Sequence, residues 1–314
     1  MIFDVKDGQA MLQRFKGTLM LLMAAFIWGT TFVAQMAGMD ELGPFTYAAA
    51  RFALGFLSLL VLWGVLHRKR EQARAEGAYH SGWKAGLGAG CIMFVASSLQ
   101  QVAMLYTTAG KTAFITCLYI ILVPLFAVFL HRTVHAENWL GAVMAVTGLF
   151  FLAVHGDLSL SMGDAIVLVS AVFWTFHILF IDHFAGRADV VELSVGQIGI
   201  CTLFSSFAAL ALEEIAWQPI LDSYVAILYG GVMSAGVAFT LQIVGQKYAD
   251  PAHAAILMSF EAIFGALAGW AILGEVMSGR EIFGCVLMAA GMIVTQLGGI
   301  LRKKEMAEIS PYVS

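Results

Sequence analysis

A glutamate in the middle of a long apolar stretch is the strongest candidate for chemistry in this sequence. The residue is Glu261, in the segment SFEAIFGALAGW. A charged side chain at the centre of a bilayer costs about 2.5–3.5 kcal/mol on insertion scales, so such acids usually face a cavity. We therefore expect Glu261 either to bind and release protons or to balance a cationic group on a ligand. The alternative is a structural ion pair or a hydrogen bond between helices.

Arg51 is the one basic residue that lies deep in an apolar stretch, about five positions from its centre. Two interpretations stand beside each other. The long side chain could extend to the membrane surface, or to Asp40 and Glu41 near it. Alternatively, the guanidinium binds a solute within the membrane.

Histidine and amide side chains within the apolar stretches are weaker candidates. His177 could relay protons, but we favour a packed, hydrogen-bonded histidine. The amides of Gln101 and Gln242 fit either a solute contact or a hydrogen bond between helices. The same two interpretations hold for Gln100 and Gln246.

Aromatic residues at depth indicate a cavity wall. The segment WGTTF places Trp28 beside Thr30 and Thr31, an arrangement that permits close backbone approach and offers hydrogen bonds. Helix packing explains the threonines at least as well. Tyr119 and Trp174 lie deep in other apolar stretches, where they suit an amphipathic organic ligand.

The elements that must position these residues are membrane-spanning helices. Hydrophobic residues make up 60% of the chain and charged residues 12%, against roughly 25% charged in soluble domains. Backbone groups in hydrocarbon must be bonded within their own segment, so apolar stretches of about 20 residues form helices. Pro124 removes a backbone donor and should act as a hinge in the fourth stretch. The sequence predicts an all-α integral membrane protein with ten spans, at about 17–37, 45–66, 84–106, 112–130, 138–155, 163–184, 191–212, 224–246, 252–273 and 281–300.

Lysine and arginine are unevenly distributed between the two sides of the predicted membrane. These residues resist translocation and collect in cytoplasmic loops. With the N-terminus inside, only Lys111 and Arg280 lie outside, and every other basic residue except Arg51 is cytoplasmic. We therefore expect a multi-pass protein of the cell (inner) membrane, with both termini cytoplasmic, as tails of residues 1–16 and 301–314.

The two halves of the chain carry matching residues at matching offsets. Tyr119 is the counterpart of Glu261, and Trp28 is the counterpart of Trp174. Each half holds five spans, an odd number, so the second half must insert with the opposite orientation. This predicts two inverted five-helix repeats, at 17–155 and 163–300, with a binding site near the midplane between them. Evenly spaced glycines predict tight packing of the fifth and tenth spans: Gly141, Gly148, Gly284 and Gly291.

Several classes of function lack support in the sequence. The net charge is only −4 and no basic cluster is interleaved with aromatic residues, which argues against nucleic-acid binding. No phosphate-binding loop and no hydrolase motif occurs, so we expect neither transport driven by ATP hydrolysis within this chain nor catalysis. No cofactor or metal site is expected either, because the cysteines lack the paired spacing of zinc ligands. We interpret all four as buried free thiols: Cys91, Cys117, Cys201 and Cys285.

Four segments recur in order along the chain: AAFIWGTTFVAQ, YAAARF, TTAGKTAFITCLYIILVPLF and SFEAIFGALAGWAILGE. Together they resemble the EamA family of the drug/metabolite transporter superfamily, over about residues 17–300. The resemblance implies a cavity lined mainly by the first, third, fourth, sixth, eighth and ninth spans, peripheral fifth and tenth spans, and export of amino acids or other metabolites. In one departure, the S-L-E-P usual in the ninth span has Ala262 in place of its proline.

The leading hypothesis is a secondary transporter, an exporter or exchanger, that moves a small organic metabolite by alternating access. Membrane lipid surrounds it, and protons are a candidate coupling ion through Glu261. The alternative is an intramembrane enzyme or lipid-carrier protein acting on a lipid-linked substrate. The sequence fits a monomer and a homodimer equally.

Overall fold

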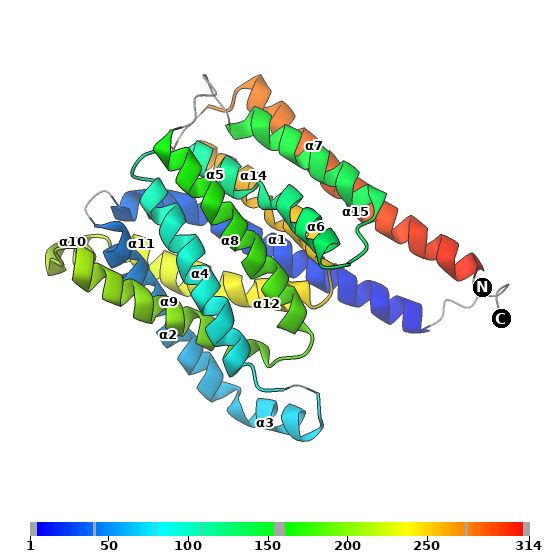
Figure 1. Cartoon of the computed structure of the whole chain (residues 1–314), viewed down its shortest axis with the longest axis horizontal. Coiled ribbons are helices and arrows are strands. Elements are labelled where there is room, and N and C mark those ends of the chain that lie inside the picture. Colours follow the sequence, from blue (N-terminus) through cyan, green and yellow to red (C-terminus); the bar gives the residue numbers. More distant parts are fainter. Residues whose placement is uncertain are drawn as a thin grey trace.

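A computed structural model shows an all-helical chain over the residues it describes, which are 5–39, 42–78, 80–107, 109–153, 161–273 and 276–309 (Figure 1). The helices of the first half are α1 (Val5–Met39), α2 (Pro44–Val65), α3 (His67–Ala75), α4 (Trp83–Ala103), α5 (Ala109–Thr116), α6 (Tyr119–Phe129) and α7 (Ala136–Ala153). Those of the second half are α8 (Met162–Ala185), α9 (Val190–Leu212), α10 (Trp217–Asp222), α11 (Tyr224–Leu228), the π-helix η1 (Tyr229–Ala238), α12 (Phe239–Gln246), α13 (Pro251–Met258), α14 (Glu261–Leu273) and α15 (Gly279–Ile309).

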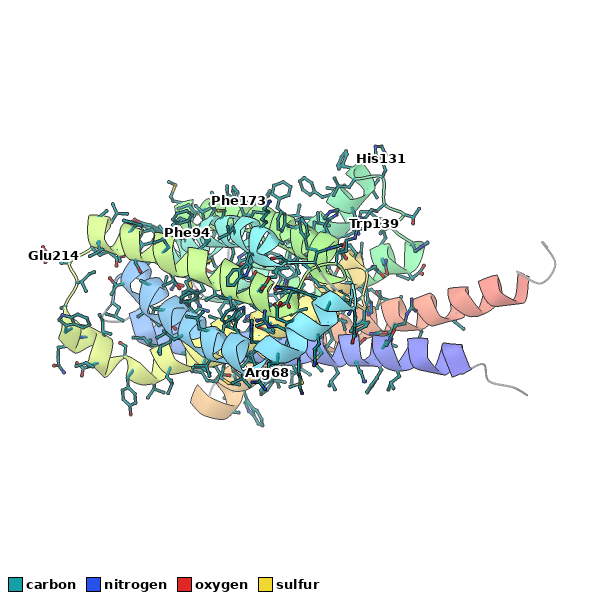
Figure 2. The ribbon with its side chains drawn as sticks, turned by 90° about the horizontal axis from the view of Figure 1, so that it is seen from below. Arg68, Phe94, His131, Trp139, Phe173 and Glu214 are labelled. Carbon is teal, nitrogen blue, oxygen red and sulfur yellow. The ribbon has the colours of Figure 1, made fainter. Side chains whose placement is uncertain are left out.

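Nine segments within the described residues are long and apolar enough to cross a membrane, and α7 supplies a shorter apolar helix. Apolar side chains cover the sides of the bundle, while Glu214 lies at one end of it (Figure 2). The chain is therefore a multi-pass, all-α membrane protein, as the sequence predicts. The two terminal helices are longer than the predicted spans, since α1 begins at Val5 and α15 runs to Ile309. A helix formed in the bilayer continues into polar sequence at little cost, because only its nucleation is expensive.

Two spans are interrupted at equivalent positions. The break between α5 and α6 falls at Cys117–Leu118, and the break between α13 and α14 falls at Ser259–Phe260. At both breaks the hydrogen bonds shorten to three residues, as in Ala262 N to Ser259 O at 3.1 Å. Pro124 lies inside α6, beyond the first break. The second break forms without a proline, and there the Ser259 hydroxyl donates to its own helix at the Ile256 carbonyl, 2.8 Å away.

Helices of the two halves interleave. The first-half helix α4 packs on α8 and α9, α2 packs on α9 and η1, and α1 packs on α12 and α14. By contrast, α7 and α15 lie side by side at the edge of the bundle (Figure 1). Their backbones approach closely: a Cβ built on Gly291 would lie 2.7 Å from the Gly141 carbonyl oxygen, and vice versa. The predicted tight packing at these glycines is confirmed.

Candidate functional site

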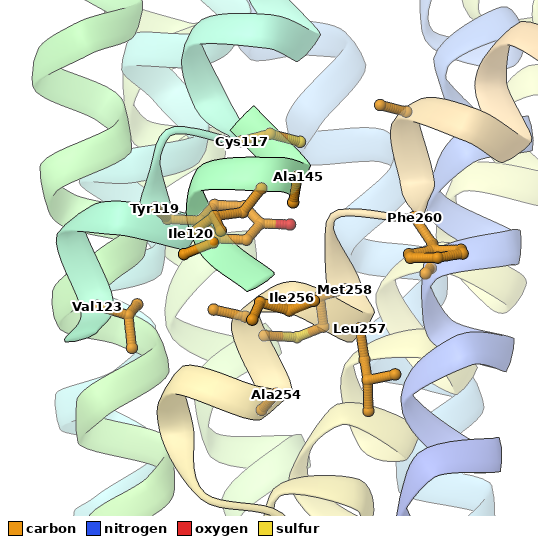
Figure 3. Close-up of a cluster of buried hydrophobic side chains, with 14 of the residues drawn as sticks. Cys117, Tyr119, Ile120, Val123, Ala145, Ala254, Ile256, Leu257, Met258 and Phe260 are labelled. Atoms are coloured by element: carbon orange, nitrogen blue, oxygen red, sulfur yellow. The ribbon is translucent and has the colours of Figure 1, made fainter. Parts of the chain in front are cut away.

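Glu261 is buried at the start of α14, with 7% of its surface exposed. Its Oε1 accepts a hydrogen bond from the Tyr119 phenol at 3.1 Å and another from the Cys117 thiol at 3.4 Å. Figure 3 shows Tyr119 and Cys117 facing the segment that carries Met258 and Phe260. Because Tyr119 begins α6 and Glu261 begins α14, the bond joins the two helix breaks. The partial positive charge at the start of α14 favours a carboxylate there.

A cavity of about 70 Å³ lies next to this hydrogen bond. That volume holds a few water molecules, whereas pockets for organic ligands usually measure about 300–1,000 Å³. The wall combines aromatic, amide, hydroxyl and charged side chains from both halves of the chain: Trp28, Phe32, Gln35, Arg51, Phe52, Ser97, Gln100, Thr116, Tyr119, Trp174, Ile178, Ser234, Phe239, Gln242, Met258 and Glu261.

Arg51 lies on this wall rather than at the membrane surface, and 6% of it is exposed. Its guanidinium carbon is 4.6 Å from the ring centre of Phe52 and 5.6 Å from that of Tyr47, within the range of cation–π attraction. Asp40 and Glu41 lie outside the described residues. Among the residues described, no carboxylate pairs with Arg51 and its Nε has no hydrogen-bond partner. A positive charge thus faces the cavity.

Three aromatic rings form one side of the wall. The Trp28 and Phe239 rings lie 4.9 Å apart, and Trp174 stacks on Phe239 at 6.1 Å with an angle of 13°. The indole nitrogen of Trp174 donates to Gln100 Oε1 at 3.2 Å. That of Trp28 has no partner among the described residues, and neither has Gln242 Oε1. Residues of the wall therefore carry a buried donor and a buried acceptor that lack partners among the described residues.

Other predicted site residues lie away from the cavity. The Thr30 hydroxyl shares a 2.5 Å hydrogen bond with the Tyr229 hydroxyl of η1. Thr31 is fully buried and donates to the Ile27 carbonyl of its own helix. Gln101 donates to the Met39 sulfur. The contacts of Thr30 and Gln101 join two helices, whereas that of Thr31 stays within α1. None of these three side chains belongs to the wall.

His177 is fully buried behind the aromatic wall. Its Nε2 lies 3.1 Å from Gln197 Oε1, in the bond between helices that a packed histidine would make. Its ring meets those of Trp174 and Phe239 edge-on, at 5.7 and 6.1 Å. His177 therefore supports the cavity from outside, through the rings that line it.

Several wall residues escape selection by residue type alone. Phe32 and Gln35 of α1 follow Trp28 by four and seven positions and so share its face of the helix. Ser97 precedes Gln100 by three positions, so these two residues also share one face of their helix, α4. Helical periodicity extended from Trp28 and Gln100 would have found these side chains. Ser234 is different, because it lies in the π-helix η1, whose five-residue hydrogen-bond spacing changes the faces of the span.

The cysteines are free thiols, but their burial differs from the prediction. Cys117 and Cys201 are buried, Cys285 is half-buried and Cys91 is exposed. The prediction of burial is wrong for Cys91 because it lies on an outward face of α4, where an apolar thiol can meet lipid. Within the described residues no three acidic, histidine or cysteine side chains gather as a metal site would require.

Comparisons with known proteins identify relatives over nearly the whole chain. The sequence profile described as the EamA-like transporter family matches residues 15–154 and 161–297. An uncharacterised transporter of Archaeoglobus fulgidus is 27% identical over 298 residues, covering 93% of this chain and 89% of that protein. The threonine/homoserine exporter RhtA of Salmonella typhimurium is 26% identical over 174 residues, covering 53% of this chain and 57% of the exporter. A solved crystal structure superposes with a TM-score of 0.75 at 20% identity, over 90% of this chain and 96% of the other, which shows a shared fold. These relatives indicate a transporter rather than an enzyme.

Proposed function

The chain belongs to the EamA-like transporter family, and from this premise we propose that it is a secondary transporter of a small organic metabolite such as an amino acid. It works as an exporter or exchanger, by alternating access around the cavity between its two helix breaks. Discontinuous helices that meet at a binding site are typical of secondary transporters. The observation that carries the proposal is the Tyr119–Glu261 bond between the two breaks, on the cavity wall.

The polar groups of the wall suit a solute with both charges. Arg51 supplies a positive charge and Glu261 a negative one. Trp28 Nε1 and Arg51 Nε are donors without partners among the described residues, and Gln242 Oε1 is an acceptor without one. Buried polar groups are usually hydrogen-bonded, so unpaired ones on a cavity wall favour a ligand or water that completes them. Aromatic rings beside them suit the apolar part of such a solute.

The volume of the cavity supports movement during transport. A space of about 70 Å³ is smaller than an amino acid, so the cavity must widen before an organic solute enters. A site that opens to one side at a time is the requirement of alternating access. Protons are the proposed coupling ion, because Glu261 is a buried acid on this wall.

The proposed topology has ten spans in two inverted repeats, 17–155 and 163–300, with both termini cytoplasmic. Three observations support it. The family profile matches two segments of similar length, residues 15–154 and 161–297. The two helix breaks occupy equivalent positions in these segments. The beginning of α1 and the end of α15 lie at the same end of the bundle, as an even number of spans requires (Figure 1).

Counterflow in proteoliposomes tests the function. Purified protein is reconstituted in vesicles loaded with one unlabelled amino acid or organic acid at a time, and entry of the labelled compound is followed. We expect saturable, transient accumulation for at least one compound that carries a carboxylate. No counterflow across a broad metabolite panel, by protein that remains folded, would contradict the proposal.

A further inference from the structure

A second, strongly charged pocket lies at the ends of helices that also line the central cavity. Its volume is about 500 Å³, within the usual range of about 300–1,000 Å³ for ligand pockets. Arg132, Arg187 and Lys247 contribute positive charges, and Asp182 and Asp250 contribute negative ones. The basic residues place this pocket on the side that the sequence predicts to be cytoplasmic.

One continuous face of α8 connects the two pockets. Trp174 and Ile178 line the central cavity, and Asp182, four residues further, lines the charged pocket. On α12, Gln242 lines the cavity and Gln246, again four residues further, lines the charged pocket. Four residues of helix rise by about 6 Å. The two pockets are therefore about one helical turn apart, along facing stripes of α8 and α12 that pack on each other.

A hydrogen bond joins these two stripes between the pockets. Gln246 Nε2 donates to the carbonyl oxygen of Ile178 at 2.9 Å. Gln246 is 2% exposed, and its Oε1 has no partner among the described residues. Gln242 Oε1, one turn deeper, lacks a partner there as well. Two buried acceptors without donors, on the line between two pockets, point to a route for hydrogen-bonding molecules.

The charged pocket can receive an anionic group. Arg132 pairs with Asp182 at its rim. Arg187 is exposed, and none of its side-chain nitrogens bonds to a described residue. A guanidinium is suited to a carboxylate, because its parallel N–H groups match the two oxygens.

We propose that this pocket is a second solute-binding site, a vestibule that holds the carboxylate of the solute at Arg187, and that the Gln246–Ile178 bond closes the passage from it to the central cavity. The inference rests on the proposed transport function. A solute crosses by binding in the vestibule, breaking this one bond, and moving past Gln246 and Gln242 to the space beside Glu261.

Charged thiol reagents test the passage without knowledge of the solute. A cysteine replaces Ser97 on the cavity wall, in protein whose four native cysteines are substituted, within inside-out membrane vesicles. The anionic 2-sulfonatoethyl methanethiosulfonate should label it faster than the cationic trimethylammonioethyl reagent, on the order of tenfold, because the vestibule concentrates anions. Arg187→Gln should abolish this preference, while the matched control Arg68→Gln, an exposed cation at the same end, should leave it intact.

The role of the Gln246–Ile178 bond in closing the passage is tested in the same vesicles. Gln246→Met keeps the side-chain length but removes the donor, and Gln246→Ala provides a second variant if the first misfolds. Both should increase labelling by the two reagents several-fold, whereas Gln72→Met on the exposed surface of α3 should not. Acetate in the medium should slow labelling by the anionic reagent. Changing the content of anionic lipid in the vesicles should leave the labelling rate unchanged. A rate that depends on this lipid would instead indicate that Arg187 binds lipid headgroups.

Labelling that shows no charge preference, or that is indifferent to Arg187 and Gln246, overturns the vestibule even if counterflow is observed. Conversely, a passage with these properties in protein without counterflow leaves the vestibule in place and removes the transport function. The two failures are therefore distinguishable.

Discussion

Glu261 and Tyr119 follow the two helix breaks and share a hydrogen bond on the cavity wall. A carboxylate held in this way can exchange a proton with the cavity while the phenol keeps it in position. An amide cannot bind and release a proton, although it can still accept the bond from Tyr119. Replacing this carboxylate by an amide therefore separates a role in proton coupling from a role in joining the helices.

We predict that Glu261→Gln abolishes uptake driven by a proton gradient and spares solute exchange. Proteoliposomes with and without an imposed pH gradient, compared with counterflow in the same vesicles, measure the two activities. Glu214→Gln, at an exposed acid at one end of the bundle, is the matched control and should retain both. An unchanged response to the gradient in Glu261→Gln would remove the proton role.

Arg51 is the residue from which we expect recognition of an anionic group. Arg51→Gln should remove inhibition of counterflow by compounds with a free carboxylate and leave their methyl esters unaffected. Arg51→Lys should restore this discrimination only in part, because an ammonium keeps the charge but loses the planar fork and the stacking on Phe52. Equal inhibition of wild type and Arg51→Gln by the free acids would contradict the assignment.

At the scale of elements, the contact between α7 and α15 has a defined energetic prediction. A Cβ at Gly148 would lie 2.8 Å from the Met288 backbone nitrogen and closer still to the Gly284 carbonyl, so valine there forces the helices apart. Overpacking of this kind typically costs about 1–3 kcal/mol. Gly148→Val should therefore lower the melting temperature in detergent, whereas Gly64→Val, where nothing lies within 4 Å, should not. Equal melting temperatures for Gly148→Val and the unchanged protein would show that α7 and α15 can move apart without loss of stability.

The helices themselves were predictable because apolar length determines them in a bilayer. The two breaks were not, since neither Cys117–Leu118 nor Ser259–Phe260 contains glycine or proline. Pro124 drew attention to the fourth span but lies inside α6. Short-range hydrogen bonds mark both breaks, and the helices beside them, α6 and α13, pack on each other and on α8. This packing cannot be read from the local sequence.

The site was predictable to the extent that depth and chemical type decide it. Glu261 and Arg51 stand out because charge is costly in a membrane, and the structure places both on one wall. Thr30 was selected as a neighbour of Trp28 in sequence, yet it points to Tyr229. Which face a residue occupies depends on how helices from both halves interleave, and that information is tertiary.

At the scale of the molecule, the proposed topology makes a further prediction. Single cysteines at Gly8 and Ser314 should react with a membrane-impermeant thiol reagent from the same side, the cytoplasmic one. The reason is that ten spans return the chain to its starting side, and the positive residues fix which side that is. Labelling of the two positions from opposite sides would require an odd number of spans and would contradict the two inverted five-helix repeats.

The bond between Tyr119 and Glu261 joins equivalent positions with unequal chemistry. If two identical inverted halves formed a transporter, its inward-open and outward-open forms would be related by a two-fold rotation and equally populated in a symmetric membrane. Here such an exchange would put a phenol where the acid stands. If the chain works by the proposed alternating access, its inward-open and outward-open forms are therefore chemically different, and we expect them to be unequally populated in the absence of solute.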